Sequence, residues 1–125
     1  MLRLDHLALQ HPEPEAVSAW LCLHIGLEVY RVSTSASRAR FLKCPRTAVM
    51  LEIYRQPEVA VPDYASMPPA ALHLAFYADD IAAEGDRLVS AGATRAGEPG
   101  KNSAGDRFLM LRDPWGVPIQ LVSRG

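Results

Sequence analysis

The chain has 125 residues, of which 49% are apolar and 22% are charged, and its formal net charge is −1 at pH 7. This length and composition suit one compact domain, or two very small modules that share a core. The near-neutral charge gives no electrostatic case for binding nucleic acid or an anionic membrane surface.

The N-terminal stretch "MLRLDHLALQ" is too short and too polar for a signal peptide. No segment approaches the roughly 18 apolar residues that a membrane-spanning helix needs. The two cysteines, Cys22 and Cys44, do not have the spacing of a metal site. We therefore expect a soluble cytoplasmic protein with two buried reduced thiols, with a disulfide as the alternative.

The first half of the chain predicts one strand, one helix and three further strands. Residues 3–10 alternate in polarity, as a strand does. Pro14 then suits the first turn of a helix, and Gly26 suits its end. The helical face is indicated by apolar spacing at Val17, Trp20, Leu21, His24 and Ile25. The three strands that follow are predicted within residues 27–32, 39–43 and 48–55.

The second half predicts the same order of elements. Residues 56–70 contain four prolines and are predicted to be an extended linker. A strand at 71–78 is followed by a helix with Asp79 or Asp80 as its cap and Gly92 at its end. A short strand, a loop at 98–106 and two strands joined by the tight turn "DPWG" complete the chain.

These two halves form an internal repeat. His6 corresponds to His73, Gly26 to Gly92 and Glu52 to Gln120, at nearly constant spacing. We therefore predict module 1 at about residues 1–55, a linker at about 56–70 and module 2 at about 71–125, within a single domain that spans residues 1–125.

The two faces of the predicted strands differ in character, because residues two apart share a face. One face is aliphatic or aromatic and should pack under the helices. The other face carries one polar residue among small or mixed neighbours, which would line a pocket if the sheet were curved. These polar residues occupy equivalent places in the repeats: His6, Glu52, His73 and Gln120.

Two imidazoles, a carboxylate and an amide suit a divalent ion such as Ni, Co, Zn, Fe or Mn. Any one of the four, taken singly, is more often an ordinary strand residue than a metal ligand. Their shared face and repeated placement favour the metal site. Candidate substrate-binding residues on the same face are Gln10, Met50, Tyr54 and Tyr77.

Three arginines at strand starts or within strands are candidates to hold a substrate carboxylate, although a solvated surface role is favoured for each. They are Arg38, Arg40 and Arg107. His11 and His24, by contrast, are interpreted as structural or solvated.

The segments "LDHLAL", "IGLEV", "VMLEIY", "ALHLAFYADD", "SAGA" and "DPWGVPIQLV" run almost from end to end of the chain. With these motifs the chain resembles the vicinal oxygen chelate superfamily, which includes glyoxalase I, bleomycin-resistance proteins, methylmalonyl-CoA epimerase and extradiol dioxygenases. The resemblance implies an α+β fold in which two βαβββ modules form a curved mixed sheet. It also implies metal ligands on the first and last strands of each module, at His6, Glu52, His73 and Gln120.

Bacterial glyoxalase I has a glutamate where this chain has Gln120. In that family the last-strand glutamate is a main base, and the metal stabilises an enediolate. An amide cannot act as a base, so Glu52 would be the catalytic residue here. The set resembles that of methylmalonyl-CoA epimerase with its two modules exchanged.

The leading hypothesis is thus a metal-dependent lyase or isomerase of the glyoxalase I type, acting on a small molecule with vicinal oxygens. A bleomycin-resistance-like protein that sequesters its ligand without chemistry is the alternative, as is a metal-dependent epimerase or dioxygenase. The resemblance implies a homodimer as the assembly.

Overall fold

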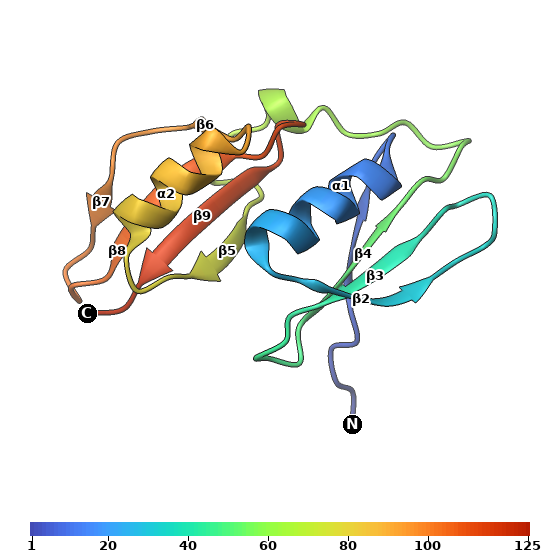
Figure 1. Ribbon diagram of the computed structural model, residues 1–125, viewed down its shortest axis with the longest axis horizontal. Coiled ribbons are helices and arrows are strands. Elements are labelled where there is room, and N and C mark those ends of the chain that lie inside the picture. The colour runs from blue at the N-terminus through green and yellow to red at the C-terminus, as the bar shows by residue number, and fades with distance from the viewer. The chain divides into compact units, whose positions relative to one another are not determined.

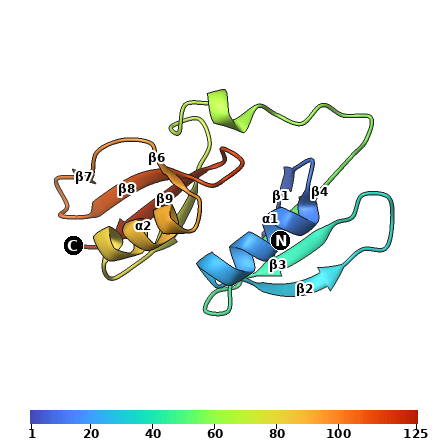
Figure 2. The ribbon, with the colours of Figure 1, turned by 45° about the horizontal axis from the view of Figure 1, so that its top comes forward.

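The computed structural model describes residues 1–125 and divides into two compact units, Met1–Pro62 and Asp63–Gly125. In each unit one helix covers one face of a mixed sheet (Figures 1 and 2). This architecture confirms the predicted α+β class.

Unit 1 follows the predicted order of strand, helix and three strands. Its sheet has the order β1-β4-β3-β2, with β1 parallel to β4 and the other pairs antiparallel. The elements are β1 (Leu7–Gln10), α1 (Pro14–Trp20), the π-helical turn η1 (Leu21–Ile25), β2 (Glu28–Val32), β3 (Arg40–Lys43) and β4 (Met50–Tyr54).

The helical stretch formed by α1 and η1 begins and ends as its sequence predicts. Pro14 occupies the first turn, where its missing N–H costs nothing. Gly26 ends η1 in the left-handed conformation, with φ of 95°. The buried side of the helix packs against β3 and β4. The core of unit 1 includes Val17, Trp20, Leu21, Leu42, Leu51 and Ile53.

Unit 2 repeats this plan with the sheet order β5-β9-β8-β6, in which β5 is parallel to β9. Asp80 caps α2 by accepting a hydrogen bond from Ala83 N, as one of the two predicted caps. The elements are η2 (Tyr64–Ser66), β5 (Leu74–Tyr77), α2 (Ile81–Ser90), β6 (Thr94–Arg95), β7 (Gly100–Lys101), β8 (Arg107–Arg112) and β9 (Pro118–Ser123).

Arg112 fixes the second part of the predicted linker onto unit 2. Its guanidinium donates to the carbonyls of Tyr64, Met67 and Gly116 at 2.8–3.1 Å. Asp113 holds the adjoining turn, because its carboxylate accepts from the N–H groups of Trp115 and Val117 at 2.9 Å. Residues 64–67 are therefore part of the fold of unit 2, where the sequence predicted only an extended linker.

Two other predictions are wrong in detail. The first strand starts at Leu7 rather than at residue 3, because its ladder with β4 begins at the pair Leu7–Leu51. Met1, Leu2 and Leu4 are left exposed, and Leu7 is also 45% exposed. In unit 2, β7 forms a short ladder with β8 inside the loop predicted at 98–106.

Gly116 provides a test of how tightly this turn packs against η2. It has φ of 96°, and a Cβ there would lie 2.7–3.0 Å from three atoms of Ala65, two of them backbone atoms. Gly26 has φ of 95° but no atom within 4 Å of its Cβ position. We expect Gly26→Ala to cost about 1 kcal/mol of unfolding free energy from backbone strain alone. Gly116→Ala should cost about 1–3 kcal/mol more, from overpacking.

Urea unfolding of both variants measures the difference. Equal losses in the two variants would show that the contact between Gly116 and Ala65 is not tight in solution.

Candidate functional site

The first and last strands of each unit pair with the same register. Ala8 lies opposite Glu52 in unit 1, and Ala75 lies opposite Gln120 in unit 2. His6 and His73 each precede these alanines by two residues. Each histidine therefore stands just before an edge strand, two residues ahead of the alanine that lies opposite the polar residue of the neighbouring strand.

Unit 1 brings His6 and Glu52 together. The Nε2 atom of His6 lies 3.7 Å from Oε1 of Glu52, and their side chains are 33% and 20% exposed. This separation is too long for a direct hydrogen bond. The two atoms would both reach one metal ion after a small shift of either side chain.

Two neighbours fix the orientation of the His6 ring. Its Nδ1 donates to Oδ2 of Asp5 at 2.7 Å, so the Nε2 lone pair of the neutral ring is directed toward Glu52. The Phe41 ring packs edge-on against the imidazole, at 5.3 Å between ring centroids. A lone pair facing a carboxylate is favourable when a proton or a cation lies between them.

In unit 2 a hydrogen bond also holds Nδ1 of the His73 ring. Its Nδ1 lies 2.8 Å from the carbonyl oxygen of Pro69. Because a carbonyl oxygen only accepts, Nδ1 carries a proton, and the lone pair of the neutral ring is on Nε2. His73 is exposed and Gln120 is half-buried. The two histidines thus share a tautomer suited to metal binding but differ in the partner that enforces it.

Within either unit, no three His, Cys, Asp or Glu side chains converge so that they could hold a metal ion. Each unit instead supplies two of the predicted donors. Imidazole nitrogen and carboxylate oxygen are normal ligands of transition-metal ions, so the residues present fit such an ion chemically.

Gln10 has a structural role that its sequence position did not reveal. It is 7% exposed. Its amide donates to Ala60 O at 3.2 Å and accepts from Arg55 Nη1 and Gln56 N at 3.1 and 2.7 Å. These bonds join the end of β1 to the chain that leaves β4, so they engage both ends of the amide.

The other candidates on this face lie in different surroundings. Tyr54 is half-buried opposite Gln10. Tyr77 is 63% exposed. Its hydroxyl donates to Asp79 at 2.7 Å, and this hydrogen bond raises the pKa of Tyr77 above its usual value.

The candidate arginines lie on the helix side of the sheets. Arg38 and Arg40 form ion pairs with Glu15 of α1, at 3.0 and 3.9 Å. Arg107 alternates with the buried Leu109 and Leu111, and it lines a small cavity of about 100 Å³ beside α2. Arg107 is therefore not on the Gln120 face, because Gln120 lies opposite Met110.

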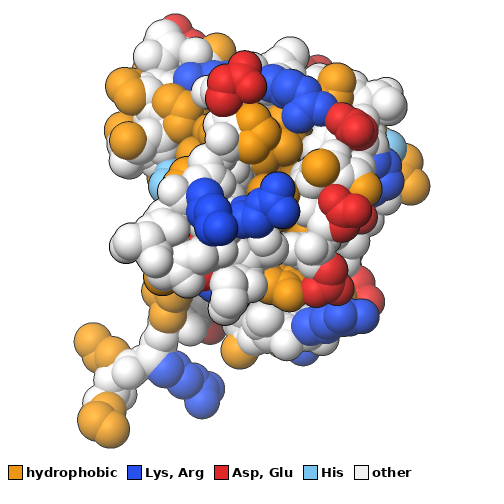
Figure 3. Space-filling model, turned by 90° about the vertical axis from the view of Figure 1, so that its left-hand side faces the viewer, with side chains coloured by type: hydrophobic (Ala, Val, Ile, Leu, Met, Phe, Trp, Pro, Cys, Tyr) orange, Lys and Arg blue, Asp and Glu red, His pale blue; other side chains and the backbone are white.

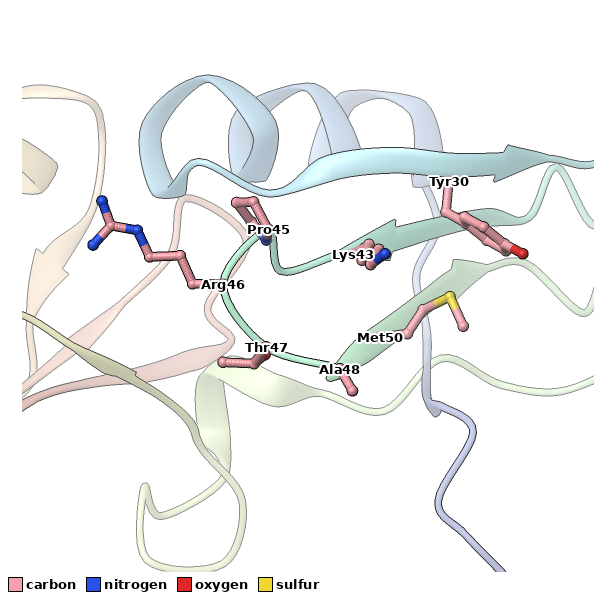
Figure 4. Close-up of a pocket in the computed structure, with 7 residues that line it drawn as sticks. All are labelled: Tyr30, Lys43, Pro45, Arg46, Thr47, Ala48 and Met50. Atoms are coloured by element: carbon pink, nitrogen blue, oxygen red, sulfur yellow. The ribbon is translucent and has the colours of Figure 1, made fainter.

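An open depression of about 650 Å³ lies on the Glu52 face of unit 1, at the β3–β4 turn. Figure 4 shows Tyr30, Lys43 and Met50 on three neighbouring strands, with Arg46 extending away from them. The lining is Tyr30, Lys43, Pro45, Arg46, Thr47, Ala48 and Met50. Of these, sequence analysis identified only Met50. Lys43 was missed, although alternation along β3 is a signal that could have found it. The contribution of Tyr30 depends on an irregularity in β2 between Val29 and Arg31.

Charges of both signs lie on one face of unit 2 (Figure 3). Basic and acidic side chains are interspersed over the face of unit 2 drawn in Figure 3, with hydrophobic side chains between them. Neither α-helix has both the length and the hydrophobicity needed to cross a membrane.

The geometry defines a protein made of two repeats built on a βαβββ plan, and in the first repeat a histidine lies beside a carboxylate of the last strand. Residues 3–121 match the Glyoxalase/Bleomycin resistance protein/Dioxygenase superfamily. The chain belongs to this superfamily, as its motifs predicted. No match is found among curated proteins.

Solved structures show the same fold. A glyoxalase family protein from Bacillus cereus is 19% identical, with a TM-score of 0.83 and coverage of 99% of this chain and 95% of its own. A glyoxalase/bleomycin resistance protein from Albidiferax ferrireducens is 20% identical, with a TM-score of 0.69 and 98% of each chain covered. TnmS3, an antibiotic binding protein from Streptomyces, is 20% identical, with a TM-score of 0.73 and coverage of 100% and 98%.

His11 is a buried histidine directly after the end of β1. It is 3% exposed, and its Nδ1 accepts from Glu13 N at 3.1 Å. Desolvation lowers its pKa below the ordinary 6.5, although the charge of Glu13 acts in the opposite direction. The unfolded chain therefore takes up this proton at a higher pH than the folded chain.

Stability should then fall as the pH drops below about 6.5. Asn at position 11 would keep an acceptor near Glu13 N without titrating. We expect His11→Asn to lose less stability than the wild type between pH 7 and pH 5, as measured by urea unfolding at each pH. Parallel pH profiles would contradict a buried neutral His11.

Proposed function

We propose that the protein binds one divalent metal ion through His6, Glu52, His73 and Gln120 and acts on a small substrate with vicinal oxygens. The reaction type is that of a glyoxalase I-like lyase or isomerase, with Glu52 as the catalytic base. Ni, Co, Zn, Fe and Mn are the candidate metals for a set of imidazoles with oxygen donors.

The observation that carries this proposal is the pairing of His6 with Glu52. Nε2 of His6 lies 3.7 Å from a carboxylate oxygen of Glu52, and the hydrogen bond from Nδ1 to Asp5 leaves the lone pair of the neutral ring on Nε2. The matching register of His73 and Gln120 supports a second pair of donors of the same design.

In this proposal a bound divalent ion would polarise the substrate oxygens and stabilise negative charge that develops on them. Glu52 would take the proton from the carbon next to a substrate carbonyl and return it to the neighbouring carbon. The hydrogen bond from His6 to Asp5 would keep the imidazole from turning away during the proton transfer. Gln120 would bind and orient, since its amide does not exchange a proton in this way.

A second candidate function is supported by the same amide. With Gln120 as a neutral donor, the site has one fewer base than the glyoxalase I pattern. A protein of the same fold, TnmS3, is described as an antibiotic binding protein. The second proposal is that the chain sequesters a small molecule without transforming it.

Both proposals take a small molecule as the partner. The donor set is completed by one chain or by two chains of a homodimer, as the family resemblance implies.

The metal site is tested by elemental analysis of the untagged protein after incubation with each of the five metals. We expect about one ion per donor set in the wild type, and loss of at least about tenfold in affinity for His6→Ala and Glu52→Ala. His24→Ala is the matched control, because it removes an imidazole outside the set.

Conversion of methylglyoxal and a thiol to the thioester then separates the two functions. Turnover that requires the metal and Glu52 supports the isomerase. Metal without turnover contradicts it. If the protein retains none of the five ions, the metal site is contradicted, and sequestration is then the proposed function.

Gln120→Glu tests whether the amide limits the site. A second carboxylate should raise affinity for the divalent ion by about tenfold or more, because affinity follows the charge of the ligand set. Isothermal titration with the ion retained by the wild type measures the change. Gln56→Glu adds the same charge at an exposed linker position and should leave affinity unchanged. Equal effects of both substitutions would place Gln120 outside the ligand set.

A further inference from the structure

Lys43 is an unpaired cation in the depression of unit 1. It is exposed and makes no ion pair, although Glu28 lies opposite it on β2. Arg38 and Arg40, in contrast, are paired with Glu15 on the helix side. The depression combines this ammonium group with the Tyr30 ring and the Met50 thioether, as Figure 4 shows.

Lys43 and Glu52 belong to one continuous face of the sheet. Lys43 lies directly opposite Met50, and Met50 and Glu52 are two residues apart on β4. Two residues along a strand correspond to about 7 Å, and one strand across the sheet to about 4.8 Å. The backbone positions of Lys43 and Glu52 are therefore on the order of 8 Å apart, which is the length of a small molecule.

We infer that the depression is an anion-binding site, and that the substrate is a small acid. Its vicinal oxygens would lie at Glu52, its carboxylate at Lys43, and its apolar or aromatic body on Tyr30 and Met50. This inference rests on the proposed function, since it assumes that the substrate occupies the Glu52 face. The depression is open to solvent, with a volume of about 650 Å³, so it would hold a ligand on one side only.

The charges around Lys43 act in both directions. The guanidinium of Arg31 lies 5.9 Å from the centroid of the Tyr30 ring and adds positive potential. Glu28 opposes it from the same level of β2. The preference for an anion is therefore modest and should weaken with salt.

The test uses benzoate and its neutral isostere benzamide, titrated into metal-free protein labelled with 13C at the methionine methyl groups. Of the four methionines, Met50 alone lines the depression, and Met67 and Met110 lie in unit 2. We expect benzoate to shift the Met50 signal with millimolar affinity, at least about threefold tighter than benzamide at low salt.

Lys43→Met keeps the apolar stem and removes the charge, so it should abolish the preference for benzoate. Lys101→Met, which removes a charge from β7 in unit 2, should preserve it. The inference is overturned if Met50 does not respond, if both probes bind equally, or if Lys43→Met retains the preference.

The metal-free Glu52→Gln variant keeps the two proposals separate. Preference for benzoate in this variant supports the anion-binding site whether or not the wild type binds a metal. Loss of that preference in Lys43→Met overturns nothing about the metal site, because the Lys43 side chain is not among its ligands.

Discussion

The parallel pairing of the first and last strands is the constraint on which each unit depends. It brings the start and the end of a module side by side, and in unit 1 the histidine before the first strand lies close to the carboxylate of the last. The helix must then cover the opposite face, where Leu51, Ile53, Ile119 and Leu121 are buried. The same strand arrangement thus forms the core on one face of the sheet and carries the polar residues on the other.

Alternation and repetition made much of this predictable from the sequence. The period of two assigned His6 and Glu52 to one face, and the repeat gave the same role to His73 and Gln120. Strand limits were less accurate, because the pattern of residues 3–10 says nothing about where β4 begins. His6 and His73 accordingly stand just before their strands rather than within them.

Alternation and repetition could not predict contacts between side chains that are distant in sequence. Gln10 sits at a strand position facing the expected pocket, yet its amide is bonded to the segment that follows β4. Arg107 stands at a strand start, where alternation from Gln120 on another strand does not fix its face. The orientation of His6 by Asp5 had a local signal, since the two residues are adjacent, but the edge-on contact with Phe41 depends on the register of β3 and β4.

The two proposed pairs of donors differ in charge, since one contains Glu52 and the other Gln120, and this difference bears on the substrate. A divalent ion bound by one carboxylate, two neutral imidazoles and one amide keeps a net charge of +1, whereas a second carboxylate would neutralise it. The proposed site would therefore favour negative charge on the substrate more strongly than a two-carboxylate site does. Lys43, unpaired on the same face as Glu52, adds a second positive charge at a distance that a small acid can span. The replacement of a base by Gln120 and the position of Lys43 thus favour the same class of ligand.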